Sequence, residues 1–296
     1  MEASGTQAGP WTVARLLGWT RDFLERRRLE SPRLCAEILL AHAMGCERIQ
    51  LHARWDTTPE SGAVDRFREL VKRAADGAPI AYLTGAKEFF SLTFEVTPDV
   101  LIPRPETEIL VERVIHLARR PDAGLQRVLD LGTGSGCIAI ALARHLPGVA
   151  VCASDVSAAA LAVAKRNAER HQLADRIEFR AGDLFAAWDE QRFDVIVSNP
   201  PYVATTAAGS LPRHVRDYEP TGALFAGEDG LAVIRRIVAD APQRLNAGGW
   251  LLLEIAYDQA AALRALLAAP SWAEVVLHRD GGGHERVAQA RCGAAR

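Results

Sequence analysis

An asparagine, two prolines and a tyrosine stand together at positions 199–202, directly after an apolar run that is typical of a buried strand. The side-chain oxygen of Asn199 and the backbone carbonyl of Pro200 can act as two fixed acceptors, because proline restricts φ and offers no competing N–H. Tyr202 adds a flat surface for a planar group. Two such acceptors can hold a planar amide or amino nitrogen in line and draw its protons out of the plane. The motif therefore predicts methylation of a planar nitrogen without a strong general base.

A glycine-rich turn, DLGTGSG, lies upstream of this motif and predicts a cofactor site. Gly132, Gly134 and Gly136 allow a tight turn and a close approach of the backbone to a ligand, and the following helix directs free N–H groups toward it. Asp155 ends the next apolar run, where a carboxylate can accept both hydroxyls of a ribose. The spacing lacks the third glycine position of the nicotinamide fingerprint, and Asp130 leads the turn. This pattern favours S-adenosyl-L-methionine over a dinucleotide.

A third apolar run ends in GDLF and contributes two more candidate cofactor contacts. Asp183 can accept a hydrogen bond from an adenine amino group, while Leu184 can pack on the ring. Taken singly, the glycines could simply form a tight turn and the aspartates could cap helices. The combination, in this order along the chain, favours a cofactor site.

The elements that must position these residues alternate between strand and helix from about residue 128 onward. This alternation predicts a parallel, doubly wound α/β sheet of the Rossmann-like type. The stretches WAEVVLHRD and ERVAQARC are close in sequence and predict an antiparallel pair that finishes the sheet. We expect strands near 128–131, 149–154, 177–180, 193–197 and 250–255.

The first part of the chain has a different pattern. Apolar residues recur at three- and four-residue spacing from Trp11 to about Gly77, which predicts a small helical domain. Residues 87–102 alternate and are rich in aromatic and β-branched side chains, which predicts a hairpin. We therefore expect a helical domain over residues 1–80, a hairpin linker over 81–104 and a methyltransferase domain over 105–296.

Composition excludes several classes of protein. A net charge of −2 and a pI near 6.5 argue against a stable nucleic-acid partner. Five scattered cysteines and eight histidines show no metal-ligand spacing, so we expect no metal site. We find no targeting segment and no run of about 18 apolar residues, and so expect a cytoplasmic protein without a membrane association.

Across nearly its whole length the chain resembles the release factor glutamine methyltransferases, the HemK/PrmC family. The phrases LIPRPETE and EPTGALFAGEDGL are the most specific, whereas NPPY alone is shared with adenine N6 methyltransferases. The other stretches that carry the resemblance are YLTGAKEFF, DLGTGSGCIAIALA, SDVSAAALAVAKRNA, GDLF, FDVIVSNPPYV and GGWLLLEI.

The resemblance implies a class I methyltransferase fold with a seven-stranded, mostly parallel sheet and an antiparallel C-terminal strand. It also implies that the helical domain over residues 1–80 recognises the substrate. It implies methyl transfer from S-adenosyl-L-methionine to the N5 side-chain amide of the glutamine in the Gly-Gly-Gln motif of class I peptide chain release factors, by an enzyme that we expect to be a monomer. The implied cofactor residues are Gly132, Thr133, Gly134, Ser135, Gly136, Asp155, Asp183, Leu184 and Asn199. The implied glutamine-binding residues are Asn199, Pro200, Pro201 and Tyr202, with Asn199 and Pro200 as the catalytic pair.

Other activities fit part of the pattern. N5 methylation of a ribosomal protein glutamine shares NPPY and the cofactor turn, and adenine N6 methylation of nucleic acid shares NPPY but would be expected to carry a basic recognition region. A binding module without catalysis would be expected to lack Asn199. We also expect residues 203–219 to wall the substrate site, and Arg104 and Glu106 either to contact the amino acid end of the cofactor or to serve the start of a helix.

Overall fold

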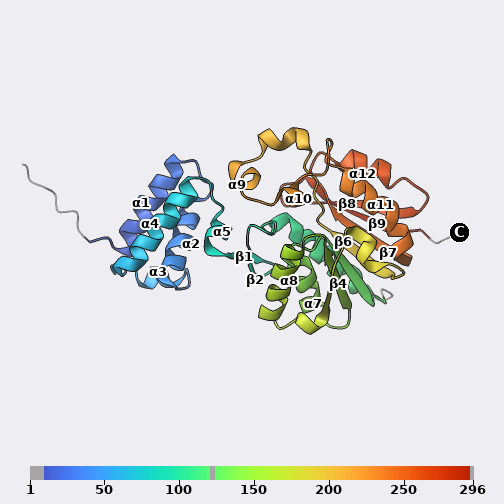
Figure 1. The fold of residues 1–296 in the computed structure, drawn as a ribbon, viewed down its shortest axis with the longest axis horizontal. Helices are drawn as coiled ribbons and strands as arrows, with labels where there is room; N and C mark the ends of the chain where they lie inside the picture. The colour runs from blue at the N-terminus through green and yellow to red at the C-terminus, as the bar shows by residue number, and fades with distance from the viewer. Residues whose placement is uncertain (1–9, 121–123, 294–296) are drawn as a thin grey trace, which may run out of the picture. The chain divides into compact units, whose positions relative to one another are not determined.

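The computed structural model describes residues 10–120 and 124–293. The chain divides into two compact units between Gly85 and Ala86 (Figure 1). The expected linker, residues 81–104, lies across this boundary. The hairpin itself falls in the second unit.

The first unit is helical, as its periodicity predicts. Thr12 begins the first helix by accepting a hydrogen bond from the backbone of Arg15, and Pro32 occupies the first position of the second helix. The core of the unit contains the fully buried side chains of Leu24, Leu39 and Phe67. The helices are α1 (Val13–Arg26), α2 (Pro32–Met44), α3 (Gln50–Ala53), α4 (Ser61–Ala75) and α5 (Ile80–Thr84).

A hairpin opens the second unit, where the alternating sequence predicts one. Strands β1 (Ala86–Phe89) and β2 (Leu92–Glu95) pair antiparallel. Phe89 and Phe94 are buried in the core beneath the hairpin. The side chain of Asn167 bonds both backbone groups of Glu95, at 2.7 and 3.0 Å, and so ties the hairpin to the main sheet's helical layer.

The main sheet has seven strands in the order β5-β4-β3-β6-β7-β9-β8. The neighbours from β5 to β7 are parallel, and β9 runs antiparallel to both β7 and β8, which confirms the predicted mostly parallel sheet. The strands are β3 (Arg127–Leu131), β4 (Ala150–Asp155), β5 (Ile177–Ala181), β6 (Phe193–Ser198), β7 (Leu245–Glu254), β8 (Trp272–Arg279) and β9 (Glu285–Cys292).

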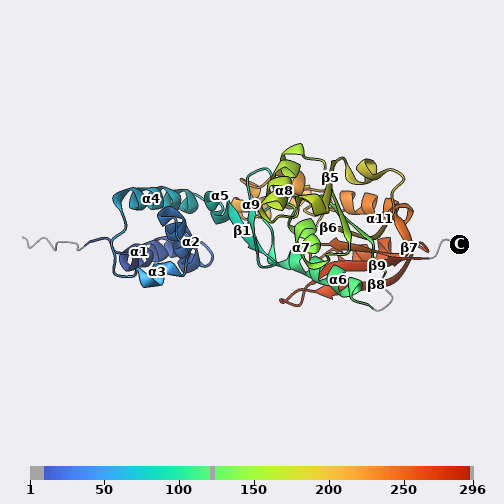
Figure 2. The same ribbon diagram turned by 90° about the horizontal axis from the view of Figure 1, so that it is seen from below.

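Helices cover both faces of this sheet (Figure 2). Successive residues of a strand point to opposite faces, so Val128 joins the core on one side and Leu129 the core on the other. The first core is formed with α6 (Glu108–Ala118), α7 (Cys137–His145) and α8 (Ala158–Arg170), the second with η3 (Leu184–Trp188), α11 (Ala232–Arg244) and α12 (Ala260–Leu266). The short elements are η1 (Pro105–Thr107), η2 (Ala174–Arg176), η4 (Thr205–Ser210), α9 (Arg213–Arg216) and α10 (Thr221–Leu224).

The strand order creates a topological switch point between β3 and β6. The chain proceeds outward from β3 through β4 to β5, then returns to the other side of β3 as β6. Ligands in open α/β sheets bind beyond the carboxyl ends of the strands at such a point. In the part of the chain that the structure describes, no helix has the length and apolar character that crossing a membrane requires.

Candidate active site

A cavity of about 410 Å³ opens at the carboxyl ends of β3, β4, β5 and β6. The structure thus brings together residues that are far apart in the sequence. The predicted residues that line it are Gly132, Thr133, Gly134, Ser135, Asp155, Asp183, Leu184, Asn199 and Pro201.

The glycine turn leaves room for a ligand. Gly132 and Gly134 have φ of +70° and +54°, and a Cβ added to either would meet no atom within 4 Å. A side chain at these two positions would therefore project into the cavity. Gly136 differs, because its Cβ would lie 3.1 Å from the side chains of Ala164 and Ile140. It serves the close packing of α7 on α8.

Asp130 organises this turn from within the core. Its side chain is fully buried, and its Oδ2 accepts from the hydroxyl of Thr133 at 2.6 Å and from the backbone N–H of Ala139 at 3.2 Å. Burial raises the pKa of the Asp130 carboxyl to about 7, although both hydrogen bonds lower it. Asp130 thus joins the end of β3 to the first turn of α7.

Asp155 is held with both oxygens at the cavity. Its Oδ2 accepts from the backbone N–H of Gly134 and its Oδ1 from that of Ser157, each at 2.9 Å. A carboxylate oxygen has two lone pairs, so each oxygen can accept one further hydrogen bond. The carboxylate is therefore oriented by the backbone and still able to bind a vicinal diol.

Asp183 and Leu184 follow β5 and line the same cavity. The Asp183 carboxylate pairs with Arg236 of α11 at 2.7 Å, and both side chains are about half exposed. The sequence pattern did not indicate this arginine, which also lines the cavity. Leu184 has a φ of +51°, an unfavourable conformation for a bulky residue of the kind that concentrates at functional sites.

The NPPY motif divides its side chains between the cavity and the protein interior. Asn199 and Pro201 line the cavity, whereas Pro200 is buried and Tyr202 packs against the core beneath α11 and α12. The amide nitrogen Nδ2 of Asn199 donates to Thr107 Oγ1 at 3.1 Å. The hydroxyl of Tyr202 donates to Glu254 Oε1 at 3.2 Å.

Several residues that support this motif escaped the sequence analysis. Gln259 Nε2 donates to the backbone carbonyls of Tyr202, at 3.0 Å, and Gly230, at 3.3 Å. A Cβ on Gly230 would lie 2.3 Å from the Tyr202 carbonyl oxygen. Glu254 ends the apolar strand β7 and is 1% exposed, which raises the pKa of its carboxyl to about 7. A carboxylate at the end of the run WLLLEI is the one local signal that could have identified it.

Arg104 lies in an ion pair. Its guanidinium donates to the buried carboxylate of Glu219, which also accepts from the backbone N–H of Ile102 at 3.2 Å. This carboxylate fastens the end of segment 203–219 to the residues that precede η1. No group of three or more histidine, cysteine, aspartate or glutamate side chains suited to a metal ion occurs within residues 10–120 and 124–293.

Two family models match the chain. Residues 15–85 match the PrmC N-terminal domain, and residues 106–211 match the methyltransferase small domain. Among solved structures, the catalytic domain of hMettl16 in complex with the MAT2A 3'UTR hairpin 6 has a TM-score of 0.57 at 22% identity, covering 77% of this chain and 83% of that one. This is a likeness of fold.

Curated relatives are similar over nearly the full length. The release factor glutamine methyltransferase of Rhodopirellula baltica is 47% identical over 282 residues, covering 94% of this chain and 95% of that protein. The protein of the same name from Geobacter sulfurreducens is 42% identical over 283 residues, covering 96% of this chain and 98% of that protein. The chain therefore belongs to the release factor glutamine methyltransferase family, as its motifs predict.

Proposed function

We propose that this enzyme transfers a methyl group from S-adenosyl-L-methionine to the side-chain N5 amide of the glutamine in the Gly-Gly-Gln motif of class I peptide chain release factors. The observation that carries the proposal is the position of Asn199. It follows β6 and lines the same cavity as the glycine turn after β3. The names of the full-length relatives support the substrate.

The cavity fits the proposed cofactor. Asp155 offers two oriented oxygens to the ribose hydroxyls, and the open space at Gly132 and Gly134 accommodates a close backbone contact. Leu184 and Val156, which is 74% exposed, offer apolar surface to the adenine ring. Asp183 can accept from the adenine amino group while it remains paired with Arg236. S-adenosyl-L-methionine, when bound, supplies the electrophilic methyl group.

Asn199 and Pro200 would act on the substrate amide. The Asn199 side-chain oxygen and the Pro200 backbone carbonyl each accept one N–H of the glutamine amide, which holds its nitrogen in place. The nitrogen would gain the methyl carbon as the sulfur–methyl bond breaks, which leaves S-adenosylhomocysteine, and it would lose one proton to solvent. The amide nitrogen becomes acidic only as the new bond forms, so the uncharged oxygens of Asn199 and Pro200 suffice as acceptors. Segment 203–219, fastened by Glu219, would form a wall of the site that receives the substrate loop.

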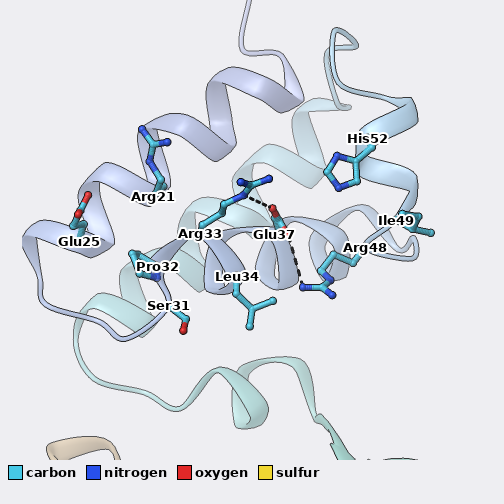
Figure 3. Close-up of a pocket in the computed structure, with 10 residues that line it drawn as sticks. All are labelled: Arg21, Glu25, Ser31, Pro32, Arg33, Leu34, Glu37, Arg48, Ile49 and His52. Atoms are coloured by element: carbon cyan, nitrogen blue, oxygen red, sulfur yellow. Dashed lines mark hydrogen bonds and ion pairs between the residues drawn. The ribbon is translucent and has the colours of Figure 1, made fainter. Parts of the chain in front are cut away.

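The helical unit would grip the protein substrate. A surface hollow of about 490 Å³ lies against α1, α2 and α3 (Figure 3). Two arginines, Arg33 at 2.9 Å and Arg48 at 3.7 Å, converge on Glu37, and the neighbouring Ile49 and Leu34 are 74% and 41% exposed. Apolar side chains beside arginines are a composition typical of protein interfaces.

Transfer of labelled methyl from S-adenosyl-L-methionine tests the substrate. The acceptors are an unmodified class I release factor, its Gln→Ala variant in the Gly-Gly-Gln motif, and a DNA duplex. We expect label on the intact factor alone. Label on DNA would support adenine methylation, and label on none of the three would overturn the release factor assignment and direct the assay to ribosomal protein.

A second experiment tests whether the helical unit binds the release factor. Ile49→Lys should raise KM for the intact factor but leave the methylation of a short Gly-Gly-Gln peptide unchanged, because the peptide lacks the rest of the factor's surface, on which the helical unit would dock. An equal effect on both substrates, or on neither, would contradict the docking role. We further propose that the enzyme acts in the cytoplasm, where its five free cysteines stay reduced.

A further inference from the structure

The hydroxyl of Thr107 connects Asn199 to a buried carboxylate. Thr107 Oγ1 lies 2.7 Å from Glu254 Oε2 and 3.1 Å from Asn199 Nδ2. Thr107 is 2% exposed and Glu254 is 1% exposed. The three residues come from η1, the end of β7 and the turn after β6. A polar chain thus runs from the sheet interior to the cavity.

Above the raised pKa of Glu254, about 7, the ionisation of its carboxylate fixes the direction of each hydrogen bond. The ionised carboxylate can only accept, so Thr107 must donate its single hydroxyl proton to Oε2. The same hydroxyl can then only accept from Asn199. The Asn199 amide must therefore turn Nδ2 toward Thr107, which leaves Oδ1 free to face the cavity.

We propose that Glu254, acting through Thr107, is a positioning residue that sets which atom of the Asn199 amide meets the substrate. This inference rests on the proposed function. An Asn199 amide turned by 180° would offer an N–H group to the N–H groups of the substrate glutamine, and two donors cannot bond each other. Catalysis requires the oxygen, and the buried carboxylate excludes the other orientation.

The second oxygen of Glu254 reinforces the arrangement. It accepts from the hydroxyl of Tyr202 at 3.2 Å, so the carboxylate contacts two of the elements that border the active site. A buried carboxylate is costly unless it is hydrogen-bonded, and here both oxygens are. Replacement of the carboxylate by an apolar side chain would release the Thr107 proton, which could then be donated to Asn199 Oδ1 and stabilise the wrong orientation.

Two disrupting variants and two conservative ones test the proposal. Thr107→Val removes the hydroxyl without changing the shape, and Glu254→Met removes the acceptor. Thr107→Ser keeps the hydroxyl, and Glu254→Gln keeps an oxygen that can accept from it. Methyl transfer to the release factor should show a kcat lowered about 100-fold or more in the first pair, the scale of losing one oriented polar group in an active site. The conservative pair should stay within about tenfold of the wild type.

A readout other than turnover separates positioning from general loss of structure. S-adenosylhomocysteine should bind all four variants with Kd within about threefold of the wild type, and KM for S-adenosyl-L-methionine should change little. The double variant Thr107→Val/Glu254→Met should be no slower than Thr107→Val alone, because both changes break the same chain of hydrogen bonds from Glu254 through Thr107 to Asn199. Wild-type kcat in Thr107→Val, or equal losses in Thr107→Ser, would overturn the proposal.

The orientation can also be observed without any substrate. The chain has only three asparagines, Asn167, Asn199 and Asn246, so asparagine-selective ¹⁵N labelling gives three side-chain amide signals. The Asn199 signal, assigned by its loss in Asn199→Asp, should move in Thr107→Val and Glu254→Met but not in Thr107→Ser. The Asn246 amide, which donates to Asp194 at 2.7 Å, is the internal control. An Asn199 signal that does not move in Thr107→Val and Glu254→Met would overturn the proposed positioning of Asn199 by Glu254 and Thr107.

The two experiments fail in distinguishable ways. If the wild type methylates no release factor, the proposed function is wrong, while the amide signals still report whether Thr107 and Glu254 hold Asn199. If the wild type is active but Thr107→Val changes neither the Asn199 amide signal nor kcat, the proposed substrate is right and the positioning role is wrong.

Discussion

Arg104 and Glu219 form an ion pair across 115 positions of the sequence, with the Glu219 side chain wholly buried and that of Arg104 28% exposed. Glu219 also accepts from the backbone of Ile102, so its carboxylate fastens segment 203–219 beside η1. The PRPETE and DYEPTG stretches of the sequence thus meet at one buried carboxylate. Their association fixes the end of segment 203–219, which contains only the short elements η4 and α9, to the residues that precede η1.

The unequal burial of this pair predicts unequal costs of substitution. Arg104→Ala leaves the Glu219 carboxylate buried without its cation, which should lower the free energy of unfolding by about 3–5 kcal/mol. Glu219→Gln leaves a partly solvated Arg104 and still offers an oxygen to Ile102, so it should cost less. Urea denaturation of both variants measures the order. A larger cost for Glu219→Gln would contradict the description of the pair.

The same pair should affect the protein substrate more than the cofactor. In Glu219→Gln, a loosened wall should raise KM for the release factor while Kd for S-adenosylhomocysteine stays unchanged. Steady-state kinetics against the factor and calorimetry with S-adenosylhomocysteine separate the two effects. A change in the cofactor affinity alone would instead support a contact of Arg104 with the amino acid end of the cofactor.

Asn199→Ala should abolish methyl transfer and leave cofactor binding nearly intact. The substitution removes the oxygen that we propose accepts from the substrate amide, but it leaves the glycine turn and Asp155 untouched. Label transfer to the release factor and equilibrium binding of S-adenosylhomocysteine check the two parts. Loss of cofactor binding would move the role of Asn199 from the substrate to the cofactor.

The sequence predicted those parts of the site that local pattern encodes. Gly132 and Gly134 stand between an apolar run and a helical one, and Asn199 directly follows the apolar run of β6. Parallel strands place all such ends at one edge of the sheet, so the cofactor turn and the NPPY motif could be expected to meet. The sequence alone therefore predicts that the two motifs share one candidate site.

The supporting contacts could not be predicted because they join distant segments. Thr107 and Glu254 are 147 positions apart, and Tyr202 and Gln259 are 57 apart. The first contact joins η1 to the end of β7, and the second joins the segments that follow β6 and β7. Neither proximity can be read from a local sequence pattern. Strand β7 also begins at Leu245, earlier than the expected Trp250, because Leu245 pairs with Phe193 across an irregularity in the ladder.

Gly134→Ala should weaken cofactor binding by filling the cavity. Gly45→Ala is a matched control for backbone strain, because Gly45 also has a positive φ, of +61°, and also has no atom within 4 Å of an added Cβ. Both variants should lose about 1 kcal/mol of stability. Only Gly134→Ala should raise Kd for S-adenosylhomocysteine. Equal affinities in the two variants would show that the space at Gly134 is not used by the cofactor.

Gly230→Ala should lower methyl transfer without filling the cofactor cavity. The added Cβ would lie 2.3 Å from the carbonyl oxygen of Tyr202, so the backbone of the NPPY motif must move. A 1 Å displacement of a positioned group can cost about 100-fold in rate. Gly148→Ala, where an added Cβ meets nothing within 4 Å, is the control and should keep wild-type kcat. Wild-type kcat in Gly230→Ala would contradict the close approach.

Glu254 should make the stability of the enzyme depend on pH in a direction that its burial sets. Its pKa is raised from 4.5 to about 7, chiefly by burial, although hydrogen bonds from Thr107 and Tyr202 and the charge of Arg286 lower it, and Glu106 raises it further. Between these values the folded state binds more protons than the unfolded state. The stability contribution is therefore full below about pH 4.5 and is lost as the pH rises through about 7.

Glu254→Gln does not titrate, so comparison with it isolates this contribution. The unfolding free energy of the wild type minus that of Glu254→Gln should fall by about 2–3 kcal/mol from pH 5 to pH 8, at 1.36 kcal/mol per pKa unit. Asp130, whose pKa is also raised to about 7, is present in both proteins and cancels. Urea denaturation at unit steps of pH provides the measurement. A difference that rises with pH would mean that hydrogen bonding outweighs burial at Glu254, and that its carboxylate is ionised at no cost to the fold.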